Sequence, residues 1–210
     1  MTTPPLLGRP AGSSGTETRQ RIMESAMRCV AEVGYSRATI RRIAKDAQMT
    51  SGSLYHYFPN KTELVEAAFN ELAATINERF QTAAHGDGTV LDRLAAILDE
   101  GERITRDFPF AAAFERAIRS EGARDLRLAE NAEDMFGQLR GLFAEIIGSA
   151  KRDGTLATGV SAQAATDAIF ALIRGLEEHS TVASTRRYRA TVQALKLLLS
   201  GTLFDYAKLS

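Results

Sequence analysis

The sequence predicts an all-α fold of about nine helices, and three observations support this prediction. Apolar residues recur at helical spacing along most of the chain. Alternating polar and β-branched apolar residues, which indicate a half-buried strand, are absent, and alanine is frequent throughout the second part. No tandem repeat of fixed period is present, which argues against a helical solenoid.

The composition is that of a globular protein with one or two domains. The chain has 210 residues, of which 44% are hydrophobic and 25% are charged. Its densest apolar stretch, residues 168–173, is far shorter than the roughly 18 residues that a membrane-spanning helix needs. Cys29 is the one cysteine, so no internal disulfide can form. We therefore expect a cytoplasmic protein that does not enter a membrane, and the first fifteen residues do not resemble a secretory signal.

The charges are divided unevenly along the chain. Although 26 basic residues balance 26 acidic ones, residues 1–62 hold nine of the basic side chains and four of the acidic ones. The remainder is correspondingly acidic. This division indicates that the first part binds a polyanion and that the second part does not.

The N-terminal part predicts an unstructured arm followed by a helix. Residues 1–15 contain three prolines and a Gly/Ser cluster without helical or strand periodicity. A helix is expected over residues 17–33, because apolar residues share one of its faces and Gly34 can end it. The same apolar face contains Cys29, which we interpret as a buried thiol without a redox role.

Capping residues predict the next three helices. Thr39 can cap a short second helix, and Thr50 or Ser51 can cap a third that ends near Phe58, since Pro59 cannot continue it. Asn60 followed by Glu63 predicts a capping box for a fourth helix that continues to residue 80.

Five further amphipathic helices are expected after the HGDG turn at residues 85–88. Their predicted ranges are residues 89–107, 109–120, 125–151, 161–181 and 187–208. We divide the chain into an arm (residues 1–15), a helix-turn-helix domain (residues 16–64) and an effector-binding and dimerisation domain (residues 65–210).

The second and third helices form a candidate DNA-reading unit. Two short helices joined by a tight turn can place the second helix in the major groove of DNA, which is about 12 Å wide. In the third helix Leu54 and Phe58 face inward, and polar and aromatic residues occupy the other sides. Four basic residues flank this helix and could contact phosphates: Arg41, Arg42, Lys45 and Lys61.

Residues 18–64, TRQRIMESAMRCVAEVGYSRATIRRIAKDAQMTSGSLYHYFPNKTEL, resemble the DNA-binding domain of the TetR family of bacterial repressors. The most specific part is SGSLYHYFPNK at residues 51–61. The resemblance implies a homodimeric repressor that a ligand releases from DNA. It also implies base contacts from Thr50, Ser51, Ser53 and His56, and phosphate contacts from Thr39, Arg41, Tyr55, Tyr57 and Lys61.

Apolar side chains on the middle helices suggest a ligand pocket, although core packing explains them equally well. The candidate lining residues are Phe110, Phe114, Met135, Phe136, Leu139, Phe143 and Leu172. A pocket of this composition favours a hydrophobic or partly hydrophobic effector. The expected partners are therefore operator DNA, a second copy of the chain and a small molecule.

The last two helices are expected to form the dimer interface. Apolar residues nearly encircle both helices, so one face can pack in the protomer while another needs a partner. The candidate interface residues are Ala168, Phe170, Ala171, Leu195, Leu198 and Leu199.

Other polar residues indicate neither a metal site nor catalysis. The three histidines belong to different segments, and Glu177 and Glu178 are adjacent, which is typical of a solvated helix edge. No nucleophilic triad or phosphate-binding glycine motif is present, so we expect no enzyme activity and no cofactor. The alternative is a DNA-binding or architectural factor whose second domain only dimerises, and an all-α enzyme is a more distant one.

Overall fold

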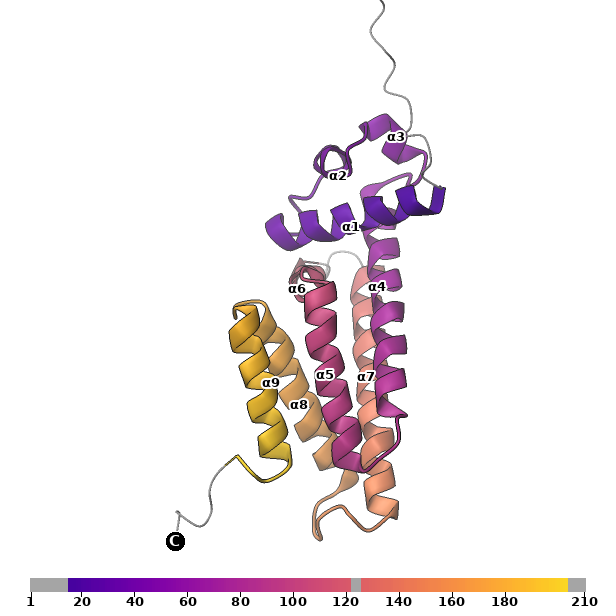
Figure 1. Cartoon of the computed structure of the whole chain (residues 1–210). Helices are drawn as coiled ribbons and strands as arrows, with labels where there is room; N and C mark the ends of the chain where they lie inside the picture. Colours follow the sequence, from indigo (N-terminus) through magenta and orange to yellow (C-terminus); the bar gives the residue numbers. More distant parts are fainter. Residues whose placement is uncertain (1–14, 122–125, 204–210) are drawn as a thin grey trace, which may run out of the picture.

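The computed structural model describes residues 15–121 and 126–203, and within them the fold is all-α, as predicted (Figure 1). The first four helices are α1 (Gly15–Val33), α2 (Ile40–Asp46), α3 (Ser51–Tyr55) and α4 (Lys61–Ala84). The other five are α5 (Val90–Asp107), α6 (Ala111–Glu121), α7 (Leu126–Arg152), α8 (Ala162–Ser180) and α9 (Thr185–Leu199). The arm predicted over residues 1–15 lies almost entirely outside the described residues.

The predicted N-caps are confirmed in the first part of the chain. The side chains of Thr39, Thr50 and Asn60 accept hydrogen bonds from the backbone N–H groups three residues later, at 3.3, 3.1 and 2.9 Å. Each cap satisfies a donor that the first turn of a helix leaves without an intrahelical partner. At Asn60 the return bond differs from a capping box, because the Glu63 carboxylate accepts from the Asn60 side-chain amide rather than from its backbone.

Three helix ends differ from the prediction by three or more residues. The fourth helix continues to Ala84, four residues beyond its predicted end. The third helix ends at Tyr55 rather than near Phe58, since the following residues form a turn in which the Tyr57 and Phe58 N–H groups both donate to the Leu54 carbonyl. The last helix ends at Leu199 rather than at residue 208. Gly201 follows with φ +72°, a left-handed conformation that ends helices. Residues 204–208 of that prediction lie outside the described residues.

The helices form a small N-terminal unit above an elongated bundle. Figure 1 shows α1 lying across the end of the bundle with α2 and α3 beyond it, and α4 running from this unit along the bundle. We call residues 15–64 the reader and residues 65–203 the bundle. Short α6 lies beneath α1. Helices α5 and α7 run alongside α4, and α8 and α9 form the opposite side of the bundle.

One hydrophobic core crosses the predicted domain boundary after residue 64. It joins reader residues such as Ile22, Ile43 and Leu54 to Phe69 of α4 and Phe114 of α6. Two further clusters fill the bundle, one between α5, α7 and α8 and one that includes Tyr188 and Val192 of α9. The reader is therefore packed directly onto the bundle.

Ion pairs join the bundle helices at their edges. Arg79 of α4 pairs with Glu100 and, at 2.9 Å, with Asp107, both of α5. Arg189 of α9 pairs with Glu102 of α5 at 2.6 Å. Such pairs on partly exposed side chains select the helix neighbours more than they stabilise the fold. No helix within residues 15–121 and 126–203 has the length and apolar composition needed to cross a bilayer.

Candidate DNA-binding surface and ligand cavity

The turn between α2 and α3 has a well-defined geometry. Gln48 adopts φ +56°, and the Met49 N–H donates to the Ala44 carbonyl at 2.9 Å. Arg21 of α1 donates from Nε to the Ala47 carbonyl at 3.1 Å, which holds the turn against α1. Leu54 is fully buried, so packing on the reader core holds α3 in place. With five residues, α3 is too short to be a stable helix by itself.

The outer side of α3 presents most of the predicted base-contacting groups. Thr50 and His56 are exposed, and Ser51 and Ser53 are half-buried. The Thr50 and Ser53 hydroxyls are 2.9 Å apart. Tyr55 is 52% exposed, which is high for a large aromatic side chain. Hydroxyl, imidazole and phenol groups together can donate to and accept from base edges or phosphates.

The two arginines and the lysine of α2 differ in whether another side chain already pairs with them, and therefore in how easily they could bind a DNA phosphate. Arg41 and Lys45 on α2 are exposed, and neither has an ion-pair or hydrogen-bond partner among the residues the structure describes. Arg42, by contrast, pairs with Glu32 at 3.1 Å. Thr39, another predicted phosphate contact, is exposed at the start of α2. The exposed face of α2 is therefore a positive surface beside α3.

Lys61 and Tyr57 are less accessible than the sequence suggested. Lys61 Nζ donates to the Tyr35 carbonyl at 2.8 Å and lies 4.2 Å from the centre of the Tyr35 ring. Burial lowers the pKa of this lysine, although the nearby Glu121 carboxylate opposes the shift. Tyr57 is half-buried and packs on the reader core. Contacts from these two residues to DNA stay predictions.

The last residue of α6 contacts the reader directly. The Ser36 N–H donates to Glu121 at 2.7 Å, and this hydrogen bond lowers the pKa of the Glu121 carboxyl. Gly34, with φ +81°, leaves room for this carboxylate, because a Cβ atom there would lie 2.2 Å from its Oε1 atom. The contact links the loop before α2 to α6, and sequence reasoning did not find it because the two residues are 85 positions apart.

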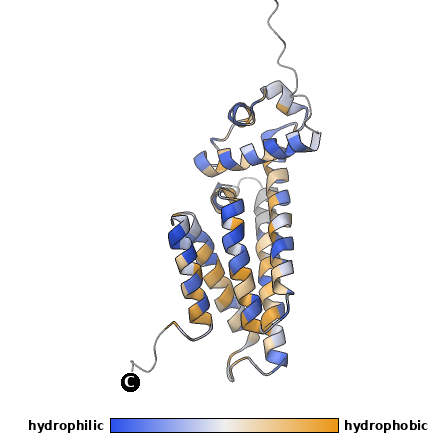
Figure 2. Ribbon diagram, viewed as in Figure 1, coloured by the Kyte–Doolittle hydropathy of each residue, from blue (hydrophilic) through white to orange (hydrophobic). Residues whose placement is uncertain are grey.

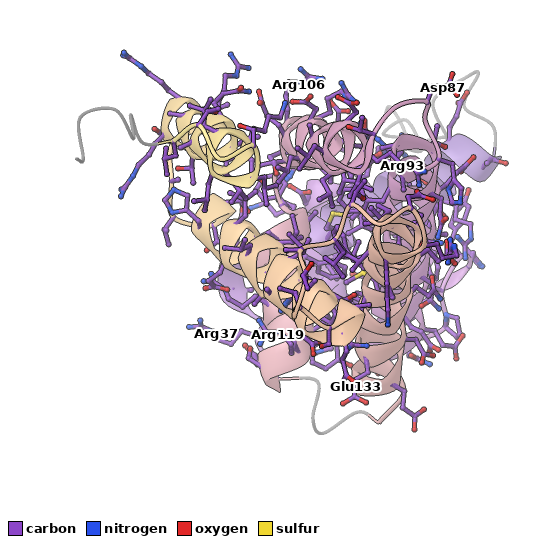
Figure 3. The ribbon with its side chains drawn as sticks, turned by 90° about the horizontal axis from the view of Figure 1, so that it is seen from below. Arg37, Asp87, Arg93, Arg106, Arg119 and Glu133 are labelled. Atoms are coloured by element: carbon purple, nitrogen blue, oxygen red, sulfur yellow. The ribbon has the colours of Figure 1, made fainter. Side chains whose placement is uncertain are left out.

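A cavity of about 190 Å³ lies within the bundle. Side chains from α4, α5, α6, α7, α8 and α9 line it, and most of them are apolar. Figure 3 views the bundle from below and shows side chains converging between its helices, whereas Arg106 and Asp87 lie at its outer edge. Three predicted pocket residues, Met135, Phe136 and Leu139 of α7, are brought together in its wall.

The other four predicted pocket residues do not line this cavity. Phe114 and Phe143 are fully buried in separate hydrophobic clusters. Phe110 lies below α1, where the Arg28 guanidinium is 5.5 Å from its ring centre. Leu172 is 40% exposed on α8. Aromatic bulk identifies core positions, but it does not distinguish a cavity wall from a filled core.

Two carboxylates in the cavity wall were missed by sequence reasoning. Glu177 lines the cavity and is half-buried, rather than lying on a solvated edge with Glu178 as expected; Glu178 is exposed and pairs with Arg116. Burial raises the pKa of Glu177 to about 7, although Arg174 pairs with it at 2.5 Å. Glu115 is buried in the same wall and accepts a hydrogen bond from Arg119 at 3.1 Å. The two acids are 62 residues apart, so only tertiary packing brings them to one cavity.

The outward faces of α8 and α9 carry exposed apolar residues. Ala168, Ala171 and Leu172 are exposed on α8, and Leu198 is exposed on α9. The other predicted interface residues are half-buried: Phe170, Leu195 and Leu199 pack partly on the clusters of their own bundle. Figure 2 shows apolar residues along α8 and the lower half of α9.

Neither the cysteine nor the acidic residues indicate a redox site or a metal site in the described part of the chain. Cys29 is buried, and this burial raises the pKa of its thiol. Among residues 15–121 and 126–203, no three histidine, cysteine or acidic side chains gather in a way that could hold a metal ion.

Comparison with known proteins places these features in a family. The profile of the bacterial regulatory proteins of the tetR family matches residues 22–68. The HTH-type transcriptional repressor AcnR of Corynebacterium glutamicum is 41% identical over 93 residues, which cover 44% of this chain and 47% of that repressor. AcnR of Corynebacterium efficiens is 30% identical over 132 residues, which cover 58% of this chain and 70% of the repressor. Both relatives are named as transcriptional repressors.

Solved structures share the whole architecture. The transcriptional regulator FadR of Bacillus subtilis, determined in complex with stearoyl-CoA, has a TM-score of 0.69 and 21% identity over 87% of this chain and 98% of its own. This similarity concerns the fold. Together with the sequence matches it leads to one conclusion: the chain belongs to the TetR family of bacterial regulatory proteins.

Proposed function

We propose that this protein is a ligand-responsive transcriptional repressor that binds a palindromic operator as a homodimer. The reader binds DNA, and the bundle dimerises and binds a small effector, in keeping with the predicted division at residues 64 and 65. The observation that carries the proposal is that two elements lining the cavity, α4 and α6, also pack against the reader.

The reader supports major-groove binding by α3 and phosphate contacts by α2. Exposed hydroxyl and imidazole groups on α3 supply direct readout, while Arg41 and Lys45 supply sequence-independent attraction. Operators can be selected from a pool of random DNA duplexes. On the selected operator, Ser53→Ala and His56→Ala should each change the preferred base at one position, by about 1 to 3 kcal/mol. Unchanged preference in both variants would exclude α3 as the reading helix.

The phosphate contacts are tested by the salt dependence of binding. Arg41→Ala should weaken binding to all sequences alike and lower the slope of log K against log salt by about 0.9. Arg42→Ala is the matched control on the same helix, because Arg42 is already paired with Glu32. The same measurement on Lys61→Ala tests whether this lysine leaves Tyr35 for a phosphate. An unchanged slope in Arg41→Ala would remove α2 from the interface.

The exposed apolar face of α8 and α9 supports a two-fold dimer of these helices. Small residues on α8 allow the helices of two protomers to approach closely, and leucines on α9 provide apolar surface that the partner can bury. The double change Leu172→Glu with Leu198→Glu should convert a dimer to a monomer in sedimentation. Leu91→Glu on α5 is the control, since Leu91 is a comparably exposed leucine, at 46%, outside this face. A monomeric parent protein at micromolar concentration would refute the dimer.

The cavity supports regulation by an effector and disfavours a bundle that only dimerises. A ligand between α4 and α6 can displace both elements, and α6 ends on the reader through the contact of Glu121 with Ser36. A coupling of about 1 to 3 kcal/mol, typical of linked sites, would lower operator affinity five- to 150-fold. Such a shift requires that the ligand bind the two conformations unequally.

Mass spectrometry of small molecules released from the purified protein identifies a candidate effector, and operator affinity with and without it tests the coupling. Ala112→Trp or Leu139→Trp should fill the cavity, abolish the response and preserve the dimer. A saturating cavity ligand that leaves operator affinity unchanged would refute ligand control and favour a constitutive DNA-binding protein.

A further inference from the structure

The charge of the cavity wall restricts the chemistry of its ligand. Among the described residues that line it, the charged ones are Glu115 and Glu177, and none is basic. A ligand anion placed here would lose part of its hydration shell and lie beside two acidic side chains, which is costly inside the bundle. A cation would instead gain charge-assisted contacts.

The positions of the carboxylates leave acceptor capacity toward a ligand. Arg119 donates to Oε1 of Glu115, and Arg174 donates to Oε2 of Glu177. Neither of the remaining carboxylate oxygens has a hydrogen-bond donor within the described parts of the chain. Both arginines lie outside the lining, and the Arg174 guanidinium is 3.7 Å from the centre of the Phe136 ring. The cavity wall is therefore acidic, although each of the two carboxylates is paired with an arginine outside the lining.

Aromatic rings form much of the remaining wall. Five aromatic residues line the cavity: Phe69 and Phe80 of α4, Phe108 directly after α5, Phe136 of α7 and Tyr188 of α9. The face of an aromatic ring attracts a cation, most strongly where water is excluded. Aromatic rings together with carboxylates are a chemical combination that recognises alkylammonium groups, whereas a neutral hydrocarbon needs no carboxylate.

The volume limits the size of the ligand. A dry cavity of about 150 Å³ accommodates a benzene molecule, so about 190 Å³ suits a ligand of the size of a small substituted benzene. Longer ligands require the helices to separate.

We propose that the cavity binds a small lipophilic cation, whose apolar body contacts α4 and α7 and whose ammonium group lies at Glu115 and Glu177. The proposal rests on the proposed function of the cavity as the effector site and specifies the chemical class of that effector. The two carboxylates belong to different helices, α6 and α8, so a cation bound between them would join these helices.

Three probes of similar size test the charge preference by calorimetry on the full chain without DNA. Benzyltrimethylammonium carries a permanent positive charge, neopentylbenzene is its neutral isostere, and 3-phenylpropanoate is an anion. The quaternary nitrogen has no N–H donor, so its charge would be attracted by the carboxylates and the aromatic ring faces alone. We expect the cation to bind about tenfold more tightly than the isostere and the anion to bind most weakly. Equal affinity of cation and isostere, tighter binding of the anion, or no binding of the cation at millimolar concentration would each overturn the proposal.

Substitutions of the two glutamates test whether their carboxylates cause the preference for a cation over its neutral isostere. Glu177→Gln and Glu115→Gln should each reduce the preference for the cation over its isostere, and both proteins should still bind the isostere if they are folded. Glu178→Gln is the matched control, because Glu178 is next in sequence but exposed. If both glutamine variants keep the full preference of the parent, the carboxylates do not bind the cation.

The affinity for the permanent cation should also rise between about pH 6 and pH 8, as Glu177 loses its proton around pH 7. The isostere should show no such rise, and a rise that persists in Glu177→Gln would contradict the assignment. The charged or titratable groups around Glu177 are Arg174 and Glu178 of α8, Glu115, Arg116 and Arg119 of α6, and Tyr188 of α9.

Operator binding separates this proposal from the function on which it rests. If the cation binds the cavity but leaves operator affinity unchanged, ligand control fails and the charge preference stands. If a neutral or anionic compound releases the operator while the cation does not bind, ligand control stands and the cation proposal fails.

Discussion

The reader and the bundle use buried space and polar side chains in opposite ways. In the reader the long helix α1 and the short helices α2 and α3 close around a filled core that includes Leu54, and the side chains of Thr39 and Thr50 cap helices at the surface. In the bundle, long helices leave a cavity open, and the carboxylates of Glu115 and Glu177 lie in its wall. A surface that must present α3 to DNA in one orientation benefits from tight packing, whereas a helical bundle that admits a ligand gives up part of its packing energy.

Truncation of a leucine to alanine should lower the free energy of unfolding more in the reader than in the bundle, and this is the largest difference that we expect. Leu54→Ala removes a fully buried side chain from a five-residue helix, so we expect a loss of about 2 to 5 kcal/mol in the free energy of unfolding and loss of operator binding. Leu139→Ala enlarges an existing cavity and should cost less than about 2 kcal/mol. Urea denaturation of both variants measures the difference, and equal losses would contradict the distinction between a filled and an open core.

The pH dependence of stability should come from the bundle. Because the pKa of Glu177 is about 7 in the folded protein and ordinarily 4.5, the folded state binds the proton more tightly. The free energy of unfolding should therefore fall as pH rises from about 4.5 to 7. With 30% of this side chain accessible, we expect a fall of about 1 to 2 kcal/mol. Denaturation between about pH 5 and pH 8 should show this fall in Glu178→Gln and not in Glu177→Gln.

The junction between the regions depends on a glycine. Gly34→Ala should cost about 1 to 2 kcal/mol, because alanine is strained at φ +81° and its Cβ displaces the Glu121 carboxylate from Ser36. Gly137→Ala on α7 is the control, since a Cβ there meets nothing within 4 Å and should stabilise the helix by about 0.5 to 1 kcal/mol. Thermal unfolding measures both. A Gly34→Ala protein as stable as the parent would show that the junction tolerates a side chain.

The smallest effects should come from the helix caps. Thr50→Ala in the reader and Ser184→Ala at the start of α9 each remove one side-chain acceptor and should each lower stability by about 1 kcal/mol. Only Thr50→Ala should also weaken operator binding, because α3 is the proposed reading helix. Filter binding with the selected operator measures this, and equal operator affinity in the two variants would mean that Thr50 only caps α3.

The sequence by itself determined the features that depend on near neighbours. Helical periodicity predicts the all-α class, hydroxyl and amide side chains at 39, 50 and 60 mark three helix starts, and the SGSLYHYFPNK segment indicates the helix that we propose reads DNA. Each of these signals involves residues within about one or two helical turns of one another, so the local sequence contains the whole interaction. The ends of α3 and α9 were less predictable, since a turn or a left-handed glycine decides them.

Tertiary structure alone decided the cavity and its charge. Phe114 and Met135 are both apolar residues on bundle helices, yet one fills a core and the other lines a cavity, because the helix crossings determine where space remains. Glu177 and Glu178 are chemically identical neighbours, but their directions differ by about 100° around α8, which places one in the cavity wall and the other in solvent. Which direction is buried depends on helices that are far apart in the sequence, and for this reason the ligand chemistry proposed for this TetR-family protein could be inferred only from its fold.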